Sequence, residues 1–351
     1  MQKKIDIRKL SEQELIDTLE SMGEKKFRGK QVYEWLWTKR ARSFEEMTNL
    51  SKSLRDKLEE KFSIYVIEIA DKQISDDGTI KYAFKLKEGH VVEGVLIPTE
   101  NRTTACISSQ VGCSLACKFC ATGKLKLMKN LEAYEIYDQV AEIYKDAEIL
   151  KSKPLSNIVY MGMGEPLLNY RNMLYSTEQI GHDKGLGMSP KRITVSTAGI
   201  AKMIKKLGDD EVRFNLALSL HAANDEKRNE IMPINESNNL EVLAEALRYF
   251  YRKTRSRVTF EYIIFKDFND TLEDAVELAE FAKCVPCKIN IIEYNPIDDG
   301  EFQQADIDKV DAFADFLESK NLIVNVRRSR GKDIDAACGQ LANKNKAVLK
   351  N

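Results

Sequence analysis

The chain has 351 residues, 43% of them apolar, which is enough to build one large domain with a smaller accessory domain. Its 54 Lys and Arg residues nearly balance 55 Asp and Glu residues, so no global positive field marks a nucleic-acid binder. Charged residues follow Met1 and no apolar run reaches a membrane span, so we expect a cytoplasmic protein without membrane association. In that reducing compartment, its seven cysteines should be ligands or catalytic thiols rather than a disulfide framework.

The first residues of the chain predict a small helical domain over 1–62. Between Ser11 and Phe62, apolar residues recur at intervals of three and four, and Gly23 and Gly29 interrupt the pattern. From residue 63 to 98 the pattern changes to alternating and β-branched residues around the turn Asp76-Asp77-Gly78. This second segment is typical of a short β-rich bridge built from hairpins.

Residues 99–320 alternate short apolar strands with amphipathic stretches of helix length. The stretch 130–150, with Asn130 as its N-cap, is one such helix. The pattern predicts an α/β fold, a partial (β/α)6 barrel, followed at 321–351 by a C-terminal strand and a segment containing Cys338. Functional residues of barrels lie on the loops that leave the C-terminal ends of the strands. The predicted strands are 104–108, 157–161, 192–196, 214–220, 258–264 and 288–293.

Three cysteines, Cys113, Cys117 and Cys120, follow the first predicted strand in the run GCSLACKFCATG. This spacing would give three thiolates to a [4Fe-4S] cluster and leave one iron open to another ligand. The alternative is a structural zinc loop, but zinc loops usually carry two pairs of ligands, and no second pair lies nearby. We therefore favour the cluster. Phe119, before the last ligand, would shield it from water or serve ordinary packing.

Polar residues follow the other predicted strands. Gly162 and Gly164 would let backbone approach a ligand closely, and Glu165 can accept hydrogen bonds from a cationic amino group. Because these residues should meet at one edge of the barrel, they predict a ligand site there. The runs are Gly162-Met163-Gly164-Glu165-Pro166 after the second strand, Ser196-Thr197 at the third, Ser219-Leu220-His221 at the fourth and Asn295-Pro296 after the sixth.

The cysteine loop resembles the radical S-adenosylmethionine (SAM) signature, in which the amino and carboxylate groups of SAM bind the open iron. Five runs further resemble the RlmN/Cfr family of RNA adenine methyltransferases: CISSQVGCSLACKFCATG, MGMGEPLLN, SLHAANDEKRNEIMPIN, PCKINIIEYNP and DIDAACGQLA. The resemblance extends from the helical N-terminus to Ala342. It implies that Cys113, Cys117 and Cys120 bind the cluster, and that SAM contacts Gly164, Glu165, Ser196, Ser219, Leu220, His221 and Asn295.

The same resemblance implies catalytic roles for Cys338, Cys106 and Glu93. One SAM would methylate Cys338, and a second would be cleaved reductively to a 5′-deoxyadenosyl radical that abstracts hydrogen from the S-methyl group. The carbon radical would add to the adenine ring, where C2 is too electron-poor for a nucleophilic route. Cys106 would release the adduct by forming a disulfide with Cys338, and Glu93 would remove the C2 proton. Without the resemblance, a lone cysteine is interpreted as a small buried hydrophobe.

The resemblance also implies the substrate and the partners. We expect C2 methylation of an adenosine in the peptidyl transferase centre of 23S ribosomal RNA and of an adenosine in transfer RNA. An electron donor such as flavodoxin or ferredoxin would feed a monomeric enzyme. Pro166 and the run PCKINIIEYNP favour C2; Cfr-like C8 methylation is one alternative, and a non-catalytic metal-binding RNA module is another. None of the family roles falls on Cys284 or Cys287, which we interpret as structural.

Three basic stretches are candidates for contacts with RNA phosphates. We expect the N-terminal domain and the C-terminal stretch to hold RNA while an adenosine is flipped into the barrel. The first stretch, beside Trp35 and Trp37, contains Lys25, Lys26, Arg28, Lys30, Lys39, Arg40 and Arg42. The second contains Lys124, Lys126 and Lys129, and the third Arg327, Arg328, Arg330 and Lys332.

Overall fold

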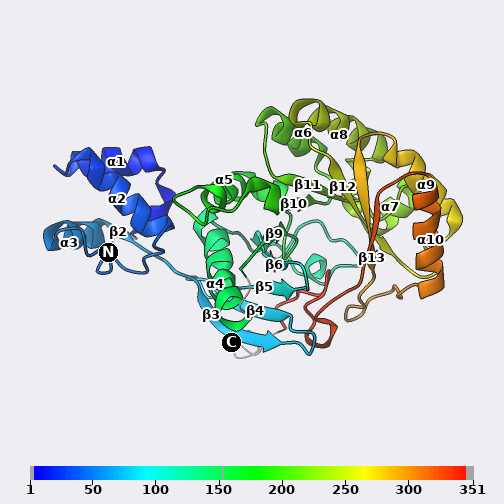
Figure 1. Ribbon diagram of the computed structural model, residues 1–351, viewed down its shortest axis with the longest axis horizontal. Helices are drawn as coiled ribbons and strands as arrows, with labels where there is room; N and C mark the ends of the chain where they lie inside the picture. Colours follow the sequence, from blue (N-terminus) through cyan, green and yellow to red (C-terminus); the bar gives the residue numbers. More distant parts are fainter. Residues whose placement is uncertain (1–3, 152–153, 345–351) are drawn as a thin grey trace.

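The computed structural model describes residues 4–151 and 154–344, so the outermost parts of the predicted segments 1–62 and 321–351 lie outside the described residues. A ten-stranded sheet forms the body of the molecule, and a small helical unit lies beside α4 and α5 at one end (Figure 1). None of the described helices combines the length and the apolar character needed to cross a membrane.

The N-terminal unit consists of α1 (Glu12–Ser21), α2 (Lys26–Trp37) and α3 (Lys52–Lys61), as the apolar spacing predicts. Ser11 caps α1 through a capping box with Glu14. Gly29 is required where α2 crosses α1, because a Cβ there would lie 2.7 Å from the Ile16 backbone. The short strands β1 (Ile5–Asp6) and β2 (Phe62–Ser63) pair in parallel and bring the two ends of the unit together.

The next three strands are antiparallel: β3 (Glu68–Ile74), β4 (Ile80–Lys85) and β5 (Val91–Pro98). The predicted turn at Asp76-Asp77-Gly78 joins β3 to β4, and Gly78 has a φ of 84°, a left-handed conformation that favours glycine. β5 pairs with β6 (Thr103–Cys106), the first strand of the predicted barrel. The β-rich segment therefore extends the same sheet as the barrel strands.

The barrel strands run parallel in the order β6, β9, β10, β11, β12, β13 and β14. All six predicted strands are present, with ends within two residues of the prediction, and β14 adds a seventh parallel strand. Helices connect these strands and cover the outer face of the sheet (Figure 1). The strands are β9 (Asn157–Tyr160), β10 (Ile193–Thr197), β11 (Asn215–Ser219), β12 (Val258–Ile264), β13 (Cys287–Glu293) and β14 (Val324–Arg327); the helices are α4 (Ala133–Lys151), α5 (Tyr170–Gly181), α6 (Ala201–Asp209), α7 (Asp225–Ile231), α8 (Leu240–Thr254), α9 (Leu272–Ala282) and α10 (Ile307–Ser319).

The prediction that Asn130 caps the helix after the cysteine loop is wrong. Asn130 belongs to the short strand β8 (Lys129–Asn130), which pairs with β7 (Gln110–Val111), and its side chain accepts a hydrogen bond from Gln110 Nε2 at 2.7 Å. The helix begins three residues later, where Glu135 Oε2 accepts from the backbone N–H of Glu132. Asn130 is thus close to the start of the helix in sequence, but its side chain bonds to the neighbouring strand and does not cap the helix.

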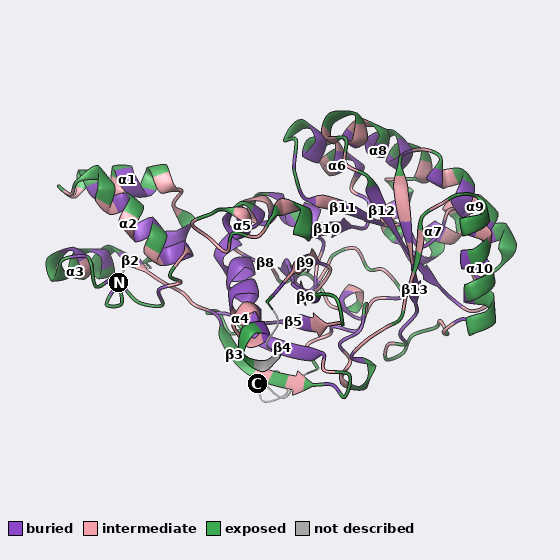
Figure 2. Cartoon of the chain, in the orientation of Figure 1, coloured by how far each residue is buried: buried purple, intermediate pink, exposed green. Residues whose placement is uncertain are grey.

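Buried side chains concentrate between the sheet and its helices (Figure 2). One apolar core runs from the N-terminal unit to the last barrel strand. A second, smaller cluster surrounds Phe119 and Phe265 inside the barrel, next to the cysteine loop. The rest of the barrel interior carries polar side chains, including Ser196, Ser219 and Glu261.

Candidate active site

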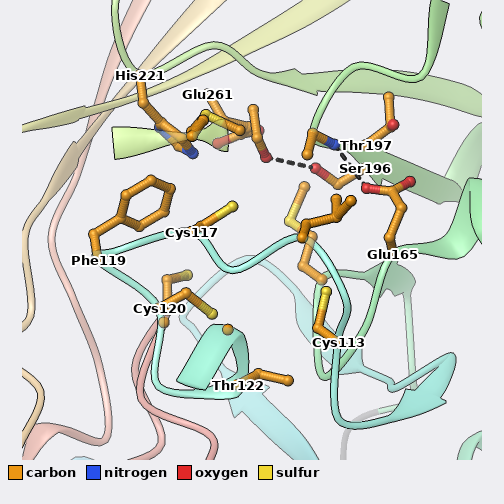
Figure 3. Close-up of a pocket in the computed structure, with 18 of the residues that line it drawn as sticks. Cys113, Cys117, Phe119, Cys120, Thr122, Glu165, Ser196, Thr197, His221 and Glu261 are labelled. Carbon is orange, nitrogen blue, oxygen red and sulfur yellow. Dashed lines mark hydrogen bonds between the residues drawn. The ribbon is translucent and has the colours of Figure 1, made fainter. Parts of the chain in front are cut away.

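A cavity of about 160 Å³ lies where the parallel strands end, inside the barrel (Figure 3). The cysteine loop forms one wall. The loops after β9, β10 and β11 form another, and inward side chains of β12, β13 and β14 complete it. Most of the residues predicted to meet at this edge of the sheet therefore line one cavity.

The cysteine loop is closed by the β7–β8 pair and is shaped by its own backbone. Cys120 N–H donates to the Cys117 carbonyl at 3.2 Å, and Gly123 N–H donates to the Cys120 carbonyl at 2.9 Å. Ala116 adopts a φ of 53° between the first two ligands. As a result, Cys113, Cys117 and Cys120 all line the cavity (Figure 3).

The donor set fits an iron–sulfur cluster better than a single metal ion. Within residues 4–151 and 154–344, no three His, Cys, Asp or Glu side chains are arranged to hold one ion. Burial raises the pKa of Cys113 to about 11 and raises the pKa of Cys117 and Cys120 as well. Thiolates at these positions need a compensating positive charge, which a cluster with several irons supplies to three separated sulfurs.

Gly164 and Glu165, in the loop after β9, line the cavity beside the base of the cysteine loop. Gly164 has a φ of 94°, and a Cβ there would lie 2.4 Å from Gln110 Cβ. Glycine is therefore required here by packing against Gln110, in addition to any approach of a ligand. Glu165 accepts hydrogen bonds from Ala198 N–H at 2.8 Å and Leu167 N–H at 3.0 Å. Burial nevertheless raises its pKa to about 7, so a cationic amino group in the cavity would favour the carboxylate.

Ser196, Ser219 and His221 line the same space (Figure 3). The two serine hydroxyls are 3.3 Å apart. His221 Nδ1 accepts from Ile263 N–H at 3.1 Å, and burial, helped by the charge of Arg228, lowers its pKa to about 3. The ring is therefore neutral with its proton on Nε2, and Phe119 packs against it at 4.8 Å between centroids.

Two predicted SAM contacts, Leu220 and Asn295, lie outside the set of residues that line the cavity. Leu220 is buried, and its N–H donates to the Glu261 carbonyl while its own carbonyl accepts from Arg228 Nε. Asn295 is also buried; its Nδ2 donates to the Cys338 carbonyl at 3.4 Å, and its Oδ1 has no hydrogen-bond partner in the described part of the chain. Asn295 Oδ1 is a buried acceptor without a donor among those residues, so it could accept a hydrogen bond from a bound ligand.

The segment that contains Cys338 is attached to the cysteine loop. Ala121 N–H donates to the Gly339 carbonyl at 2.7 Å, and Thr122 Oγ1 donates to the Leu341 carbonyl at 2.6 Å. Cys338 itself is exposed to the cavity. These bonds place a thiol from the C-terminal segment beside the three thiols of the loop.

Cys106 ends β6 and is buried close to Cys338. Burial raises its pKa to about 12, and a charge on Cys338 would raise it further. No disulfide joins Cys106 to Cys338 in the structure. Cys284 and Cys287 lie at the start of β13, at the end of the sheet opposite the cavity.

Two charged residues of the cavity wall, Glu261 and Arg327, were not predicted from the sequence as catalytic or cofactor-binding residues. Glu261 projects from β12, and its Oε2 lies 3.4 Å from Arg327 Nη1 on β14. Arg327, predicted to contact RNA phosphates around the opening, lines the cavity, where its charge counteracts the raised pKa of Cys106 and Cys338. A carboxylate inside an apolar predicted strand was the available signal for Glu261.

Glu93, the predicted base, is buried in β5 and is not among the residues that line the cavity. Its Oε2 accepts from the backbone N–H groups of Ala342 and Asn343, at 3.0 and 3.1 Å. Lys81 Nζ lies 3.9 Å from the other carboxylate oxygen. In this arrangement Glu93 holds the end of the Cys338 segment.

Most cations of the predicted RNA-binding stretches have partners inside the protein. Arg42 pairs with Glu142, Lys129 with Glu135, and Arg328 and Lys332 with Glu293. Lys124 donates to backbone carbonyls. Trp37 is fully buried, whereas Trp35 is partly exposed under Lys39, so only Trp35 could meet a ligand. Lys25, Lys26, Lys30 and Lys126 make no ion pair with a described carboxylate.

Comparison with known proteins agrees with this geometry. Residues 5–64 match the ribosomal RNA large subunit methyltransferase N-terminal domain, and residues 107–282 match the radical SAM superfamily. A probable dual-specificity RNA methyltransferase RlmN of Cytophaga hutchinsonii is 62% identical, over 97% of this chain and 93% of the relative. The dual-specificity RNA methyltransferase RlmN of Geobacter sulfurreducens is 45% identical, over 97% of this chain and 92% of its own.

A solved structure shares the whole architecture. The crystal structure of a radical SAM methyltransferase from Sphaerobacter thermophilus superposes with a TM-score of 0.90 at 36% identity. The match covers 96% of this chain and 99% of that one. The fold is therefore shared over almost the whole length of the chain.

Proposed function

Since the chain belongs to the RlmN family of radical SAM RNA methyltransferases, we propose that it methylates C2 of an adenosine in 23S ribosomal RNA and in transfer RNA. The observation that carries the proposal is the position of Cys338. Its thiol faces the cavity that the three loop cysteines line, and two hydrogen bonds fix its segment to their loop. A structural cysteine would have no reason to occupy this position.

The residues of the cavity divide into those that hold cofactors and those that react. Cys113, Cys117 and Cys120 would bind a [4Fe-4S] cluster, while Gly164, Glu165, Ser196, Ser219 and His221 would bind SAM. Reductive cleavage of SAM at the cluster supplies a radical that abstracts hydrogen. Cys338 receives a methyl group from one SAM and presents it to the adenine, so each turnover consumes two SAM molecules.

Cys106 and Glu93 act in the release of the methylated RNA from Cys338. The Cys106 thiolate attacks the Cys338 sulfur, so an S–S bond forms while the bond from that sulfur to the methylene on adenine breaks, and the freed carbon takes a proton. Reopening the disulfide needs two electrons from a thiol reductant. Glu93 removes the C2 proton once the end of the Cys338 segment, which now occupies its carboxylate, moves aside. The one unpaired electron left on the adduct would return to the cluster.

The partners follow from the same chemistry. RNA is held in part by the N-terminal unit, where Lys25, Lys26 and Lys30 have no ion-pair partner among the described carboxylates. Reduction of the cluster needs a low-potential donor such as flavodoxin or ferredoxin. The enzyme acts as a monomer.

Anaerobic reconstitution with iron, sulfide, SAM and reductant tests the proposal. We expect 5′-deoxyadenosine, 2-methyladenosine in the RNA and one methyl group on Cys338, each measured by mass spectrometry. The C338A variant should give no methylated RNA. Formation of 8-methyladenosine alone would replace the C2 assignment with Cfr-like chemistry. Absence of 5′-deoxyadenosine would leave a metal-binding RNA module.

A further inference from the structure

A row of polar side chains on β12, β13 and β14 continues the cavity wall beside Arg327. Along a strand, alternate residues share one face, so the residue two positions before Ile292 of the cavity wall, Asn290, also points inward. Asn325 on β14 is exposed and donates to Asn290 Oδ1 at 3.3 Å, and Asn290 Nδ2 donates to Glu261 Oε1 at 2.8 Å. A chain of polar groups therefore leads from solvent to the cavity wall beside Arg327.

Cations lie on the N-terminal side of this polar row, which runs across β12, β13 and β14. Lys288 lies on β13, two residues before Asn290 and on the same inner face. The others lie just before neighbouring parallel strands, whose N-terminal ends meet at one edge of the sheet. We call this group the basic rim; it contains Arg102, Arg192, Arg213, Arg255, Arg257 and Lys288.

The basic rim is not neutralised by the protein. No ion pair joins any of its six members to a carboxylate of residues 4–151 and 154–344, in contrast to Arg42, Lys129 and Arg328. Asp209, the last residue of α6, and Asp210 precede Arg213, but they accept hydrogen bonds from the hydroxyls of Tyr249 and Tyr170. Neighbouring cations repel one another, so a group of unpaired ones fits a polyanion.

The rim also borders the N-terminal unit. Lys184, in the loop that leads to Arg192, pairs with Glu12 of α1 at 3.1 Å, and its carbonyl accepts from Thr38 after α2. His182 of the same loop packs against Tyr33. A nucleic acid bound to the helical unit would therefore reach the rim without crossing the cysteine loop.

On these grounds we propose that the basic rim binds the phosphates that flank the target adenosine, so that the base enters the barrel from the N-terminal edge of the sheet. This inference rests on the proposed function. Arg102 lies close enough to the cavity wall for Arg327 to repel its charge. Partial burial and this repulsion lower the pKa of Arg102. The base would pass Asn325 and Asn290 and meet Cys338 from the side opposite the cluster.

The test compares two triple variants of the full-length enzyme. R213A/R257A/K288A removes three rim charges, and K202A/R248A/K309A removes three exposed charges from the outer helices α6, α8 and α10. Binding of an RNA stem–loop carrying the adenosine is measured by fluorescence anisotropy over a series of salt concentrations. The rim variant should lose at least tenfold in affinity and about 2 in the slope of log affinity against log salt, at about 0.7 per contact with single-stranded phosphates.

The outcomes separate this inference from the proposed function. Wild type and control variant should methylate the RNA with equal KM, while the rim variant shows a raised KM. The inference about the rim would be wrong if wild type and rim variant had equal slopes of log affinity against log salt, and if the slope fell instead when Lys25, Lys26 and Lys30 were neutralised. The proposed activity would not be affected by that result. No RNA methylation by wild type would instead remove the proposed function. If melting shows the triple variant unfolded, K288A alone should lower the slope by about 0.7.

Discussion

At the scale of single residues, Arg327 sets the reactivity of Cys338. Burial raises the pKa of the Cys338 thiol, and the nearby guanidinium of Arg327 counteracts this by stabilising the thiolate. Glu261 holds the guanidinium through an ion pair of 3.4 Å. The thiolate is the nucleophile that would attack a methyl sulfonium, so its population governs the first methyl transfer.

Replacing Arg327 with Met should therefore raise the pKa of Cys338. A rise of about one unit, or 1.4 kcal/mol, would slow alkylation of Cys338 about tenfold at any pH well below that pKa. Mass spectrometry of the Cys338 peptide after timed exposure to iodoacetamide, from pH 6 to 10, measures the profile. The R327K control keeps the charge and should shift the profile less. An R327M profile that overlies that of wild type would remove this role.

The proposed role of Cys106 in product release can be tested separately. If Cys106 resolves the adduct, the C106S variant should accumulate RNA covalently attached to Cys338, because a hydroxyl cannot form the disulfide that frees it. A denaturing gel should show a protein–RNA band that survives heat and is absent for C106S/C338A. The C284S variant, changed at the opposite end of the sheet, should turn over normally. Normal turnover by C106S would exclude the disulfide step.

The residue scale also shows what sequence can predict about a site. Cys113, Cys117 and Cys120 are near in sequence, so their spacing alone indicated a common ligand. Cys106 and Cys338 lie on different strands and loops, and only a family resemblance could pair them. The run of cations around Arg327 predicted positive charge near Cys338, but it did not predict that the Arg327 side chain would line the cavity, because the alternation of a short strand is not visible within a charged run.

At the scale of elements, the β3–β4 hairpin supports the segment that leads to Cys338. Asp77 Oδ2 accepts from Gly331 N–H at 2.9 Å, and its Oδ1 accepts from Thr79 N–H at 2.9 Å. Arg330 Nε lies 3.5 Å from the same carboxylate. Although partial burial acts to raise the pKa of Asp77, the hydrogen bonds and Arg330 hold it at about 2.

The D77N variant should lower the free energy of unfolding by about 1 kcal/mol at pH 7, less than a fully buried charged hydrogen bond because the carboxylate is partly exposed. An aspartate in the unfolded chain has a pKa of about 3.9. The folded value is lower, so wild type keeps this contribution above about pH 4 and loses it as the pH falls toward 2. Urea unfolding at several pH values measures the difference.

Asp76 provides the control for this prediction. It neighbours Asp77 in the same turn, but its side chain accepts no hydrogen bond within the described residues. D76N should change the free energy of unfolding by less than about 0.5 kcal/mol, as surface substitutions usually do. Equal effects of D76N and D77N at pH 7 would show that the turn does not depend on the Asp77 carboxylate.

Element boundaries show the limits of sequence patterns in the same way. The predicted strand ends lie within two residues of the observed ends. The strands of a parallel sheet are buried on both faces, so each one is a continuous apolar run between two helices and is easily located in the sequence. Asn130 failed as a cap because its best partner, Gln110, is 20 residues away in a strand of two residues. Such short strand pairs carry no periodicity and depend on tertiary contacts alone.

At the scale of the whole molecule, the buried cation Arg8 is one of the contacts that fix the N-terminal unit to the sheet domain, beside the Lys184–Glu12 pair and the packing of Trp37 on Tyr137. Arg8 Nη1 donates to both oxygens of Asp138 on α4, at 2.8 and 3.0 Å, and Arg8 Nη2 donates to the Tyr65 carbonyl at 2.7 Å. Asp6 completes the set at 3.2 Å, and the Tyr134 ring lies 4.5 Å from the guanidinium. The resulting orientation brings the helical unit against the loop before the basic rim.

Removing Asp138 should loosen this attachment. The D138A variant leaves Arg8 buried with half its charge compensation, which typically costs about 3 kcal/mol. The E142A variant breaks the more exposed Arg42 pair on the same helix and should cost less than about 1 kcal/mol. Urea unfolding gives both values, and proteolysis between α3 and β3 reports release of the unit. If the basic rim and the helical unit share one RNA, D138A should also raise the KM for RNA more than E142A does, and equal values would show that RNA binding does not depend on this orientation.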